Sequence, residues 1–201
     1  MNVTDLIKKK LEKAVTREQA EEAIKVLLAW AGENSKREGL LDTPKRVVKA
    51  FEEYFSGYLI DPYKDLEKTF GDVDGYDDMV IQKNISIYSH CEHHMAPIVG
   101  VAHVAYIPHE KVVGLSKLAR VVEAYSRRLQ TQERLTMEIA NTIFKGLKAQ
   151  GAAVSINAVH HCMTSRGIKK HEATTVTNYF TGMFKESHNL QNRFLQYIGQ
   201  K

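Results

Sequence analysis

The stretch SHCEHHMAP, residues 89–97, gathers side chains that can bind a metal or move a proton. Positions 90–94 hold one cysteine, one glutamate and three histidines. Thiolate and imidazole are ligands that zinc prefers in proteins, and imidazole and carboxylate are also common general acids and bases. The stretch therefore predicts a metal site, a proton-transfer site or a combination of the two.

A second segment, VHHCM at residues 159–163, supplies ligands of the same kind. The chain has two cysteines, Cys91 and Cys162, and five of its nine histidines lie within a few residues of one or the other. A disulfide between them is disfavoured in a reducing compartment. We therefore predict that the two distant segments share one metal ion.

The expected backbone decides which side chains of the second segment can reach the first. An alternating apolar pattern leads into it and indicates a strand. If this strand continues through Cys162, then His160 and Cys162 point to one face and His161 to the opposite face. We therefore expect His160 and Cys162 to converge on the first segment, where Cys91 and His94 form a C-x-x-H pair.

Two interpretations of the ligand set stay open. Four ligands, made of Cys91, His94, Cys162 and one more histidine, would form a closed structural zinc site. Three ligands would leave a position for water, whose pKa zinc lowers to roughly 7, and the site would be catalytic. His93 and His160 would then be free for acid–base work.

The totals describe an ordinary protein of 201 residues with 43% hydrophobic and 26% charged residues. This length predicts one domain with a helical extension. A net charge of +4 is too small to indicate nucleic-acid binding. The start of the chain lacks the features of a signal peptide, and no apolar run is long enough to span a membrane, so the expected compartment is the cytoplasm.

The first third of the chain is expected to be helical. Thr16 with Gln19 resembles a capping box, and a second helix is expected to start with Thr43 as its N-cap. The apolar positions at helical spacing are Ala23, Val26, Leu27 and Trp30 in the first helix, then Val47, Val48, Phe51 and Phe55 in the second. We predict an N-terminal helical region over residues 1–75 and a catalytic domain over residues 76–201.

From Met79 onward the apolar period changes to two, with Met79, Ile81, Ile85 and Ile87 alternating with polar residues as in a half-buried strand. Further strands are expected at about residues 98–107, 151–162 and 174–184, with helices starting near Ser116 and Thr131 and a short helix at the C-terminus. The predicted class is α+β, with an antiparallel four-stranded sheet and two helices on one face. Its exposed edges favour oligomerisation.

A cluster of cations follows the predicted N-cap Ser116. Lys117 and Arg120 are three residues apart, so they share a face of the first helical turn. Cations at a helix N-terminus oppose the helix dipole, which a bound anion would explain. Arg46 repeats the pattern, and Arg166 directly follows the metal segment. A solvated basic face is the alternative to a polyphosphate site.

Four long motifs resemble GTP cyclohydrolase I, a zinc enzyme family of pterin and folate biosynthesis. They are DTPKRVVKAFEEYFSGY, HCEHHMAPIVGVAHVAYIP, GLSKLARVVEAYSRRLQTQERLT and VHHCMTSRGI. The resemblance covers nearly the whole chain. It implies the tunnelling fold, in which sheets of several subunits join into a barrel, and a homo-oligomer, usually a decamer, with active sites at subunit interfaces.

The resemblance also implies a role for each matching residue. Cys91, His94 and Cys162 match the zinc ligands, and His93 and His160 match the histidines that are not ligands. Glu133 matches the carboxylate that holds guanine, with Gln132 beside it, and Ser116 matches a hydroxyl near the ribose. The residues that match the triphosphate clamp are Lys117, Arg120, Arg166 and Arg46.

The implied reaction opens the imidazole ring of GTP at C8, releases formate and rearranges the product to 7,8-dihydroneopterin triphosphate. Three alternatives stay open. The first is a structural-zinc assembly or binding module, and the second is a GTP hydrolase of the same fold that stops after ring opening. The third is a relative of this fold that handles pterins or deazapurines.

Overall fold

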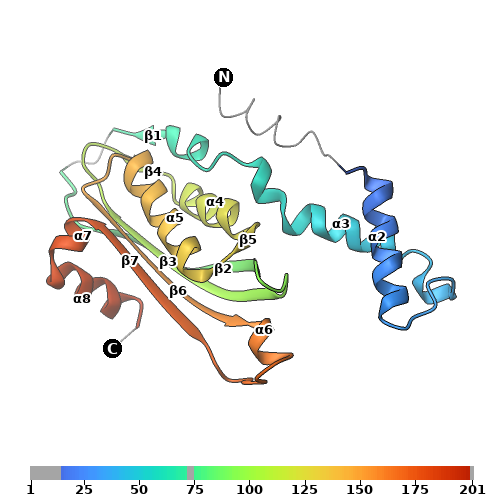
Figure 1. Ribbon diagram of the computed structural model, residues 1–201. Coiled ribbons are helices and arrows are strands. Elements are labelled where there is room, and N and C mark those ends of the chain that lie inside the picture. Colours follow the sequence, from blue (N-terminus) through green and yellow to red (C-terminus); the bar gives the residue numbers. More distant parts are fainter. Residues whose placement is uncertain (1–14, 72–74, 200–201) are drawn as a thin grey trace.

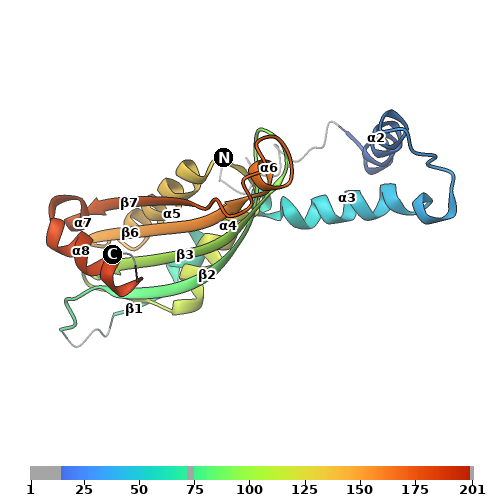
Figure 2. The ribbon, with the colours of Figure 1, turned by 90° about the horizontal axis from the view of Figure 1, so that it is seen from below.

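The computed structural model describes residues 15–71 and 75–199, which form a helical arm and a sheet-based body (Figure 1). The arm consists of α2 (Arg17–Trp30) and α3 (Thr43–Tyr54), with the short 3-10 helix η1 (Glu38–Leu40) between them. Figure 2 shows α2 standing away from the body, with α3 as the connection. The next two 3-10 helices, η2 (Ser56–Leu59) and η3 (Lys64–Glu67), pack on the body.

Local sequence signals fix where the arm helices begin. Thr16 caps α2 by a complete capping box, because its hydroxyl accepts from the N–H of Gln19 and its own N–H donates to Gln19 Oε1 at 2.8 Å. The predicted N-cap Thr43 is the first residue of α3 instead, and Asp42 occupies the N-cap position without a side-chain hydrogen bond.

The apolar stripe of α2 is exposed in the single chain. The side chains at the predicted helical spacing include Val26, Leu27 and Trp30, which are 62%, 57% and 86% exposed. None of the residues of α2 is buried. The amphipathic pattern is therefore present, but its apolar face lies outside the core of the body.

The body contains the predicted antiparallel four-stranded sheet. Its long strands are β2 (Val80–Cys91), β3 (Pro97–Ile107), β6 (Gly151–His160) and β7 (Thr175–Gly182), in that spatial order. A two-residue strand, β5 (Leu129–Gln130), extends the sheet by pairing in parallel with the end of β2. A separate small sheet pairs β1 (Thr69–Phe70) with β4 (Val112–Val113).

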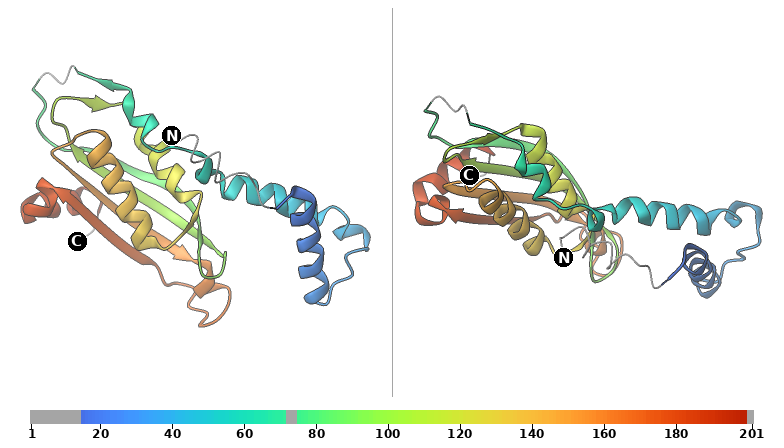
Figure 3. Two further views of the ribbon diagram at one scale, coloured as in Figure 1. Left: turned by 45° about the horizontal axis from the view of Figure 1, so that its top comes forward. Right: turned by 90° about the horizontal axis from the view of Figure 1, so that it is seen from above.

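Two long helices, α4 (Leu115–Ser126) and α5 (Gln132–Gly146), cover one face of this sheet (Figure 3). They bury apolar side chains against it, namely Leu118, Val121, Val122, Leu135, Ile139 and Ile143. A second core forms where α7 (Met183–Glu186) and α8 (His188–Tyr197) pack, and it contains Met79, Ala105, Ile107, Phe184 and Phe194. The predicted α+β class, with four long antiparallel strands and two helices on one face, is confirmed. Within the described ranges, no helix is both long and apolar enough to cross a membrane.

A bulge in β2 changes the core into which the apolar side chains of the strand pack. The register to β3 shifts by one residue between Gln82 and Ile85, and Asn84 has a positive φ of 58°. Its N–H donates to Nδ1 of the buried His103 at 3.3 Å. Apolar residues before the bulge, Met79 and Ile81, therefore belong to the second core, whereas Ile85 and Ile87 belong to the core under α4 and α5. The simple alternation expected for this strand is wrong in this respect.

Candidate metal centre and active site

Among the described residues, Cys91, His94 and Cys162 form a group that could hold a metal ion. One ligand atom from each of the three side chains lies within 4.8 Å of the others. Cys91 ends β2, and His94 lies in the tight turn that follows it. Two backbone hydrogen bonds of 2.8 Å close this turn, from Cys91 N to Ala96 O and from Met95 N to Cys91 O. The C-x-x-H pair is thus brought together by local structure alone.

Cys162 reaches this group by a different route from the one expected. β6 ends at His160, and Cys162 lies in the short helical turn α6 (His161–Thr164). The prediction that the strand continues through Cys162, with His161 on the opposite face, is therefore wrong. The helical turn still carries the thiol of Cys162 to Cys91 and His94.

The chemistry of this donor set fits zinc. Two thiols and one imidazole are ligands that catalytic zinc sites use, and three ligands leave a fourth position. Burial, and then the proximity of Cys91, raises the pKa of the Cys162 thiol above its ordinary value. A divalent cation between the two sulfur atoms would favour their thiolate forms, as metal binding to cysteine generally does. Both cysteines are free thiols.

His93 lies beside the metal group on its exposed side. Its side chain is 66% exposed, and its Nδ1 is 3.8 Å from Cys91 Sγ. Its Nε2 lies 3.9 Å from Oε1 of Glu92. This histidine can therefore contact both the metal site and a molecule arriving from solvent.

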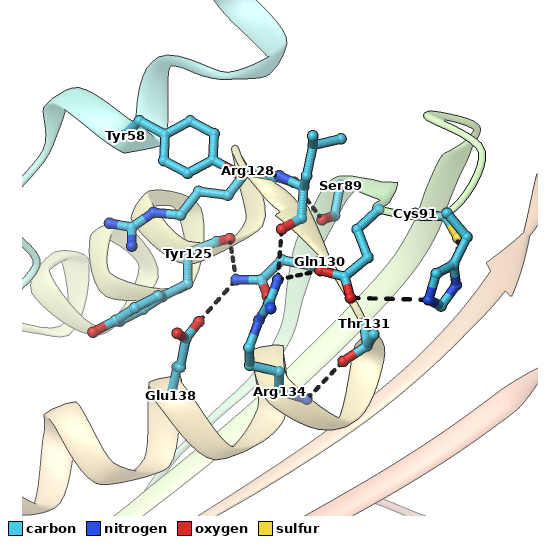
Figure 4. Close-up of polar contacts among 12 residues, drawn as sticks. Tyr58, Ser89, Cys91, Tyr125, Arg128, Gln130, Thr131, Arg134 and Glu138 are labelled. Carbon is cyan, nitrogen blue, oxygen red and sulfur yellow. Dashed lines mark hydrogen bonds and ion pairs between the residues drawn. The ribbon is translucent and has the colours of Figure 1, made fainter. Parts of the chain in front are cut away.

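A polar network behind the metal turn was not predicted. Arg134 Nη2 donates to Glu92 Oε2 at 2.6 Å, and Arg134 Nε donates to Oε1 of the buried Gln130 at 2.9 Å. Gln130 Nε2 in turn donates to Glu138 Oε2 at 2.8 Å, so the chain of contacts runs from the turn into α5 (Figure 4). The signal for it in the sequence was a run of polar residues at the start of a helix that is otherwise amphipathic.

His160 and Gln132 form a close polar contact near the metal group. His160 Nε2 lies 2.7 Å from Gln132 Oε1. Burial lowers the pKa of His160, and the nearby charge of Glu133 opposes this shift. Gln132 was expected beside guanine, yet it is 2% exposed and both ends of its amide are engaged within the chain. Glu133, the next residue, is exposed.

The predicted anion-binding residues of α4 lie at the far end of that helix from the metal group. β5 follows the C-terminal end of α4 and pairs with Cys91, so this end of α4 is the one near the metal group. The first turn of α4 lies about 15 Å from that end along the helix axis. Lys117 and Arg120 both contact Asp65 Oδ1, at 2.9 and 3.2 Å. The hydrogen bond from Lys117 is the first cause that lowers the pKa of Asp65. Gly114, rather than the predicted Ser116, is the N-cap of α4.

The other two predicted cations have different surroundings. Arg166 lies next to the metal group, with Nη1 3.2 Å from His94 Nε2. Arg46 lies in α3, where Nη2 is 3.3 Å from Asp42 Oδ2, and its side chain is 75% exposed. One chain therefore brings Arg166 to the metal group, but it does not bring Lys117, Arg120 or Arg46 there.

Comparisons with known proteins show the family of the chain. The family model described as GTP cyclohydrolase I matches residues 20–199. "GTP cyclohydrolase 1" of Pelagibacter ubique (strain HTCC1062) is 67% identical over 188 residues, which are 94% of this chain and 93% of that protein. "GTP cyclohydrolase 1" of Maricaulis maris (strain MCS10) is 55% identical over 183 residues, 91% of this chain and 89% of that protein.

Among solved structures, the apo form of the archaeosine synthase QueF-Like superposes on this chain with a TM-score of 0.43 at 16% identity. The superposition covers 52% of this chain and 93% of the QueF-Like chain. The sequence matches extend from the arm to the C-terminal helix and include both metal-binding segments. The chain belongs to the GTP cyclohydrolase I family.

Proposed function

We propose that this chain catalyses the GTP cyclohydrolase I reaction: hydrolytic opening of the GTP imidazole ring at C8, release of formate and rearrangement to 7,8-dihydroneopterin triphosphate. The observation that carries the proposal is the cluster of Cys91, His94 and Cys162, with His160 close by in the chain. This group lies within residues 20–199, which match the family model.

Cys91, His94 and Cys162 would hold the zinc ion. When bound, zinc supplies a water molecule with a pKa of roughly 7 and thus a hydroxide at neutral pH. His160 would deliver a proton to N7 of the purine as charge develops there. The exposed His93 would serve as a second acid–base group.

Glu133 would recognise the guanine base. Its exposed carboxylate can accept hydrogen bonds from N1–H and the 2-amino group. Adenine lacks both donors and would leave the carboxylate unpaired, at a cost of a few kcal/mol. Ser116, in the first turn of α4, would assist the ribose steps.

The triphosphate would bind the cations Lys117, Arg120, Arg166 and Arg46. Arg166 lies beside the metal group of its own chain. The first turn of α4 lies at the other end of the helix, so Lys117 and Arg120 would come from a neighbouring subunit. Arg46, on the arm, would also act from a neighbouring subunit.

The proposed assembly is a homo-oligomer, a decamer by analogy with the family, with active sites at subunit interfaces. The exposed apolar side chains of α2 supply a surface that needs a partner. The outer edge of β7 supplies a strand edge that a neighbouring sheet can pair. The proposed compartment is the cytoplasm, where thiol ligands stay reduced.

The test is incubation of the zinc-loaded protein with GTP, with and without a strong chelator, while formate and the pterin chromophore are measured. Both products, lost with the chelator, are the expected result. Formate without pterin would favour the hydrolase that stops after ring opening. If neither product forms, the remaining alternatives are the structural-zinc module and the relative that handles pterins or deazapurines.

A further inference from the structure

The side-chain amide of Gln132 has only one chemically acceptable orientation. Its nitrogen Nε2 faces the backbone carbonyl oxygens of Ile156 at 3.1 Å and Thr175 at 2.8 Å. Rotating the amide by 180° would place its oxygen against these two carbonyl oxygens, neither of which can donate a hydrogen bond. Oε1 must therefore be the atom that faces His160.

A short chain of hydroxyl groups fixes the same orientation. Thr136 Oγ1 donates to the backbone carbonyl of Gln132 at 2.7 Å, so its proton is committed. Thr177 Oγ1, 2.7 Å from Thr136 Oγ1, must then be the donor of that pair. Thr177 Oγ1 can then only accept from Gln132 Nε2, 3.1 Å away, whose two hydrogens are shared among this oxygen and the two carbonyls. Gln132 is 2% exposed and Thr136 1%, so water does not compete within this chain.

The orientation of Gln132 decides where His160 carries its proton. An amide oxygen can only accept, so His160 Nε2, 2.7 Å away, must be an N–H donor. In the neutral imidazole the lone pair then resides on Nδ1. Any proton that His160 exchanges with another molecule passes through Nδ1 as long as this hydrogen bond persists.

We propose that Gln132 is a positioning residue that holds His160 in the tautomer with the proton on Nε2 and directs its proton exchange to Nδ1. This assigns Gln132 a role other than contact with guanine. The consequence for turnover rests on the proposed function, in which His160 is the proton donor. The placement of the proton itself does not rest on that function.

Two substitutions separate positioning from scaffolding. Gln132→Met has nearly the same shape and removes the acceptor for His160. Gln132→Glu keeps an acceptor for His160 but places a second oxygen against the carbonyls of Ile156 and Thr175, so it should be the less stable variant. If Gln132 positions His160, kcat should follow the opposite order to stability, and Gln132→Glu should have a higher kcat than Gln132→Met.

For Gln132→Met we expect kcat for formate release to fall about 10- to 100-fold, with KM within about twofold of the parent and zinc content unchanged. In a His160→Ala background, Gln132→Met should lower the residual rate no further. Thr142→Val is the matched control, because it removes the buried 2.7 Å hydrogen bond to Tyr125 from the same helix and should leave kcat unchanged. A rise in KM at constant kcat, or a loss that persists without His160, would overturn the proposal.

A spectroscopic measurement tests the tautomer without any turnover. The zinc-loaded protein, labelled with ¹⁵N in its histidine rings, is measured by magic-angle-spinning NMR at about pH 8, where a neutral ring is expected. The His160 signals are identified by their loss in His160→Ala. The expected result is a protonated Nε2 and an unprotonated Nδ1 in the parent protein, with this preference lost in Gln132→Met. A protonated Nδ1 in the parent protein would refute the proposal even if GTP is turned over normally.

Discussion

Arg134 Nη2 lies 2.6 Å from Oε2 of Glu92, so the first turns of α5 are joined to the turn that carries Cys91 and His94. Arg134 also donates to Gln130 Oε1 at 2.9 Å and to the carbonyl of Leu129 at 2.8 Å. One guanidinium therefore connects the metal turn, β5 and α5. The turn that carries two of the proposed metal ligands is thus held by a residue that would not contact the metal.

Arg134→Met should destabilise the folded protein and loosen the metal turn. It leaves the buried amide oxygen of Gln130 without its donor, which costs about 1–2 kcal/mol. Chemical denaturation measures this loss, and competition with a chromophoric chelator measures the weaker zinc affinity. Arg37→Met is the control, because it removes an exposed pair of similar length, 2.7 Å to Glu33, and should change neither quantity. Equal behaviour of the two variants would contradict the anchoring role of Arg134.

Cys162→Ala should remove the metal and the activity together. Two ligands from one turn hold zinc far more weakly than three converging ligands. Metal analysis after dialysis should give about one zinc ion per chain for the parent protein and well below this for the variant. His109→Ala, a substitution at an exposed histidine, should keep the zinc. A metal-replete Cys162→Ala protein would show that the ligand set is different.

Asp65→Asn should improve the binding of GTP at low ionic strength. In the structure the carboxylate of Asp65 pairs with both Lys117 and Arg120, the two cations proposed for the triphosphate, and offsets part of their charge. Removing this internal competitor should lower KM for GTP about 3- to 10-fold, with the effect shrinking as salt is added. Asp78→Asn breaks the 2.6 Å pair with Arg193 and should leave KM unchanged. An unchanged KM in Asp65→Asn would argue against a phosphate role for this pair of cations.

His103 should make the protein less stable in mild acid. Burial, and then the charge of Lys83, lowers the pKa of His103. The unfolded chain therefore binds the proton more readily, so the free energy of unfolding falls as the pH drops below about 6.5, the unfolded value. His103→Gln keeps an acceptor for the N–H of Asn84 but cannot titrate. Its melting temperature should depend less on pH between about 8 and 5.5 than that of the parent protein.

The comparison of His103→Gln with its parent isolates one histidine, because His90 and His160, whose pKa values burial also lowers, are present in both proteins. His109→Gln, at an exposed position, should show the pH dependence of the parent. Parallel curves for His103→Gln and the parent would mean that His103 does not contribute.

Features that depend on neighbouring residues could be predicted from the sequence. The capping box of Thr16, the strand and helix order after residue 78 and the turn that joins Cys91 to His94 each arise within a few residues. Cys162 was predicted to join them for an incorrect reason. The prediction assumed a strand that continues from His160 to Cys162, whereas Cys162 lies in a helical turn, which directs its side chains differently. The family resemblance covered this gap in the local argument.

Features that depend on distant residues were missed. Asp65 lies 52 residues before Lys117, so nothing near Lys117 in the sequence reveals its partner. Glu92 and Arg134 are 42 residues apart and meet only because β5 places α5 beside the end of β2. The bulge at Asn84 was missed because the side chain that meets it there, His103, comes from the neighbouring strand.

That bulge also determines how this family member can change in length. A slip of one residue in the register of a strand turns the side chains of the slipped segment to the other face of the sheet. Here one residue at position 84 separates side chains that fill two different cores. A descendant that lost Asn84 would turn Met79 and Ile81 away from α8 and towards the other face of the sheet. Length variation in this lineage is therefore expected to spare β2 and to accumulate in connections that belong to neither core.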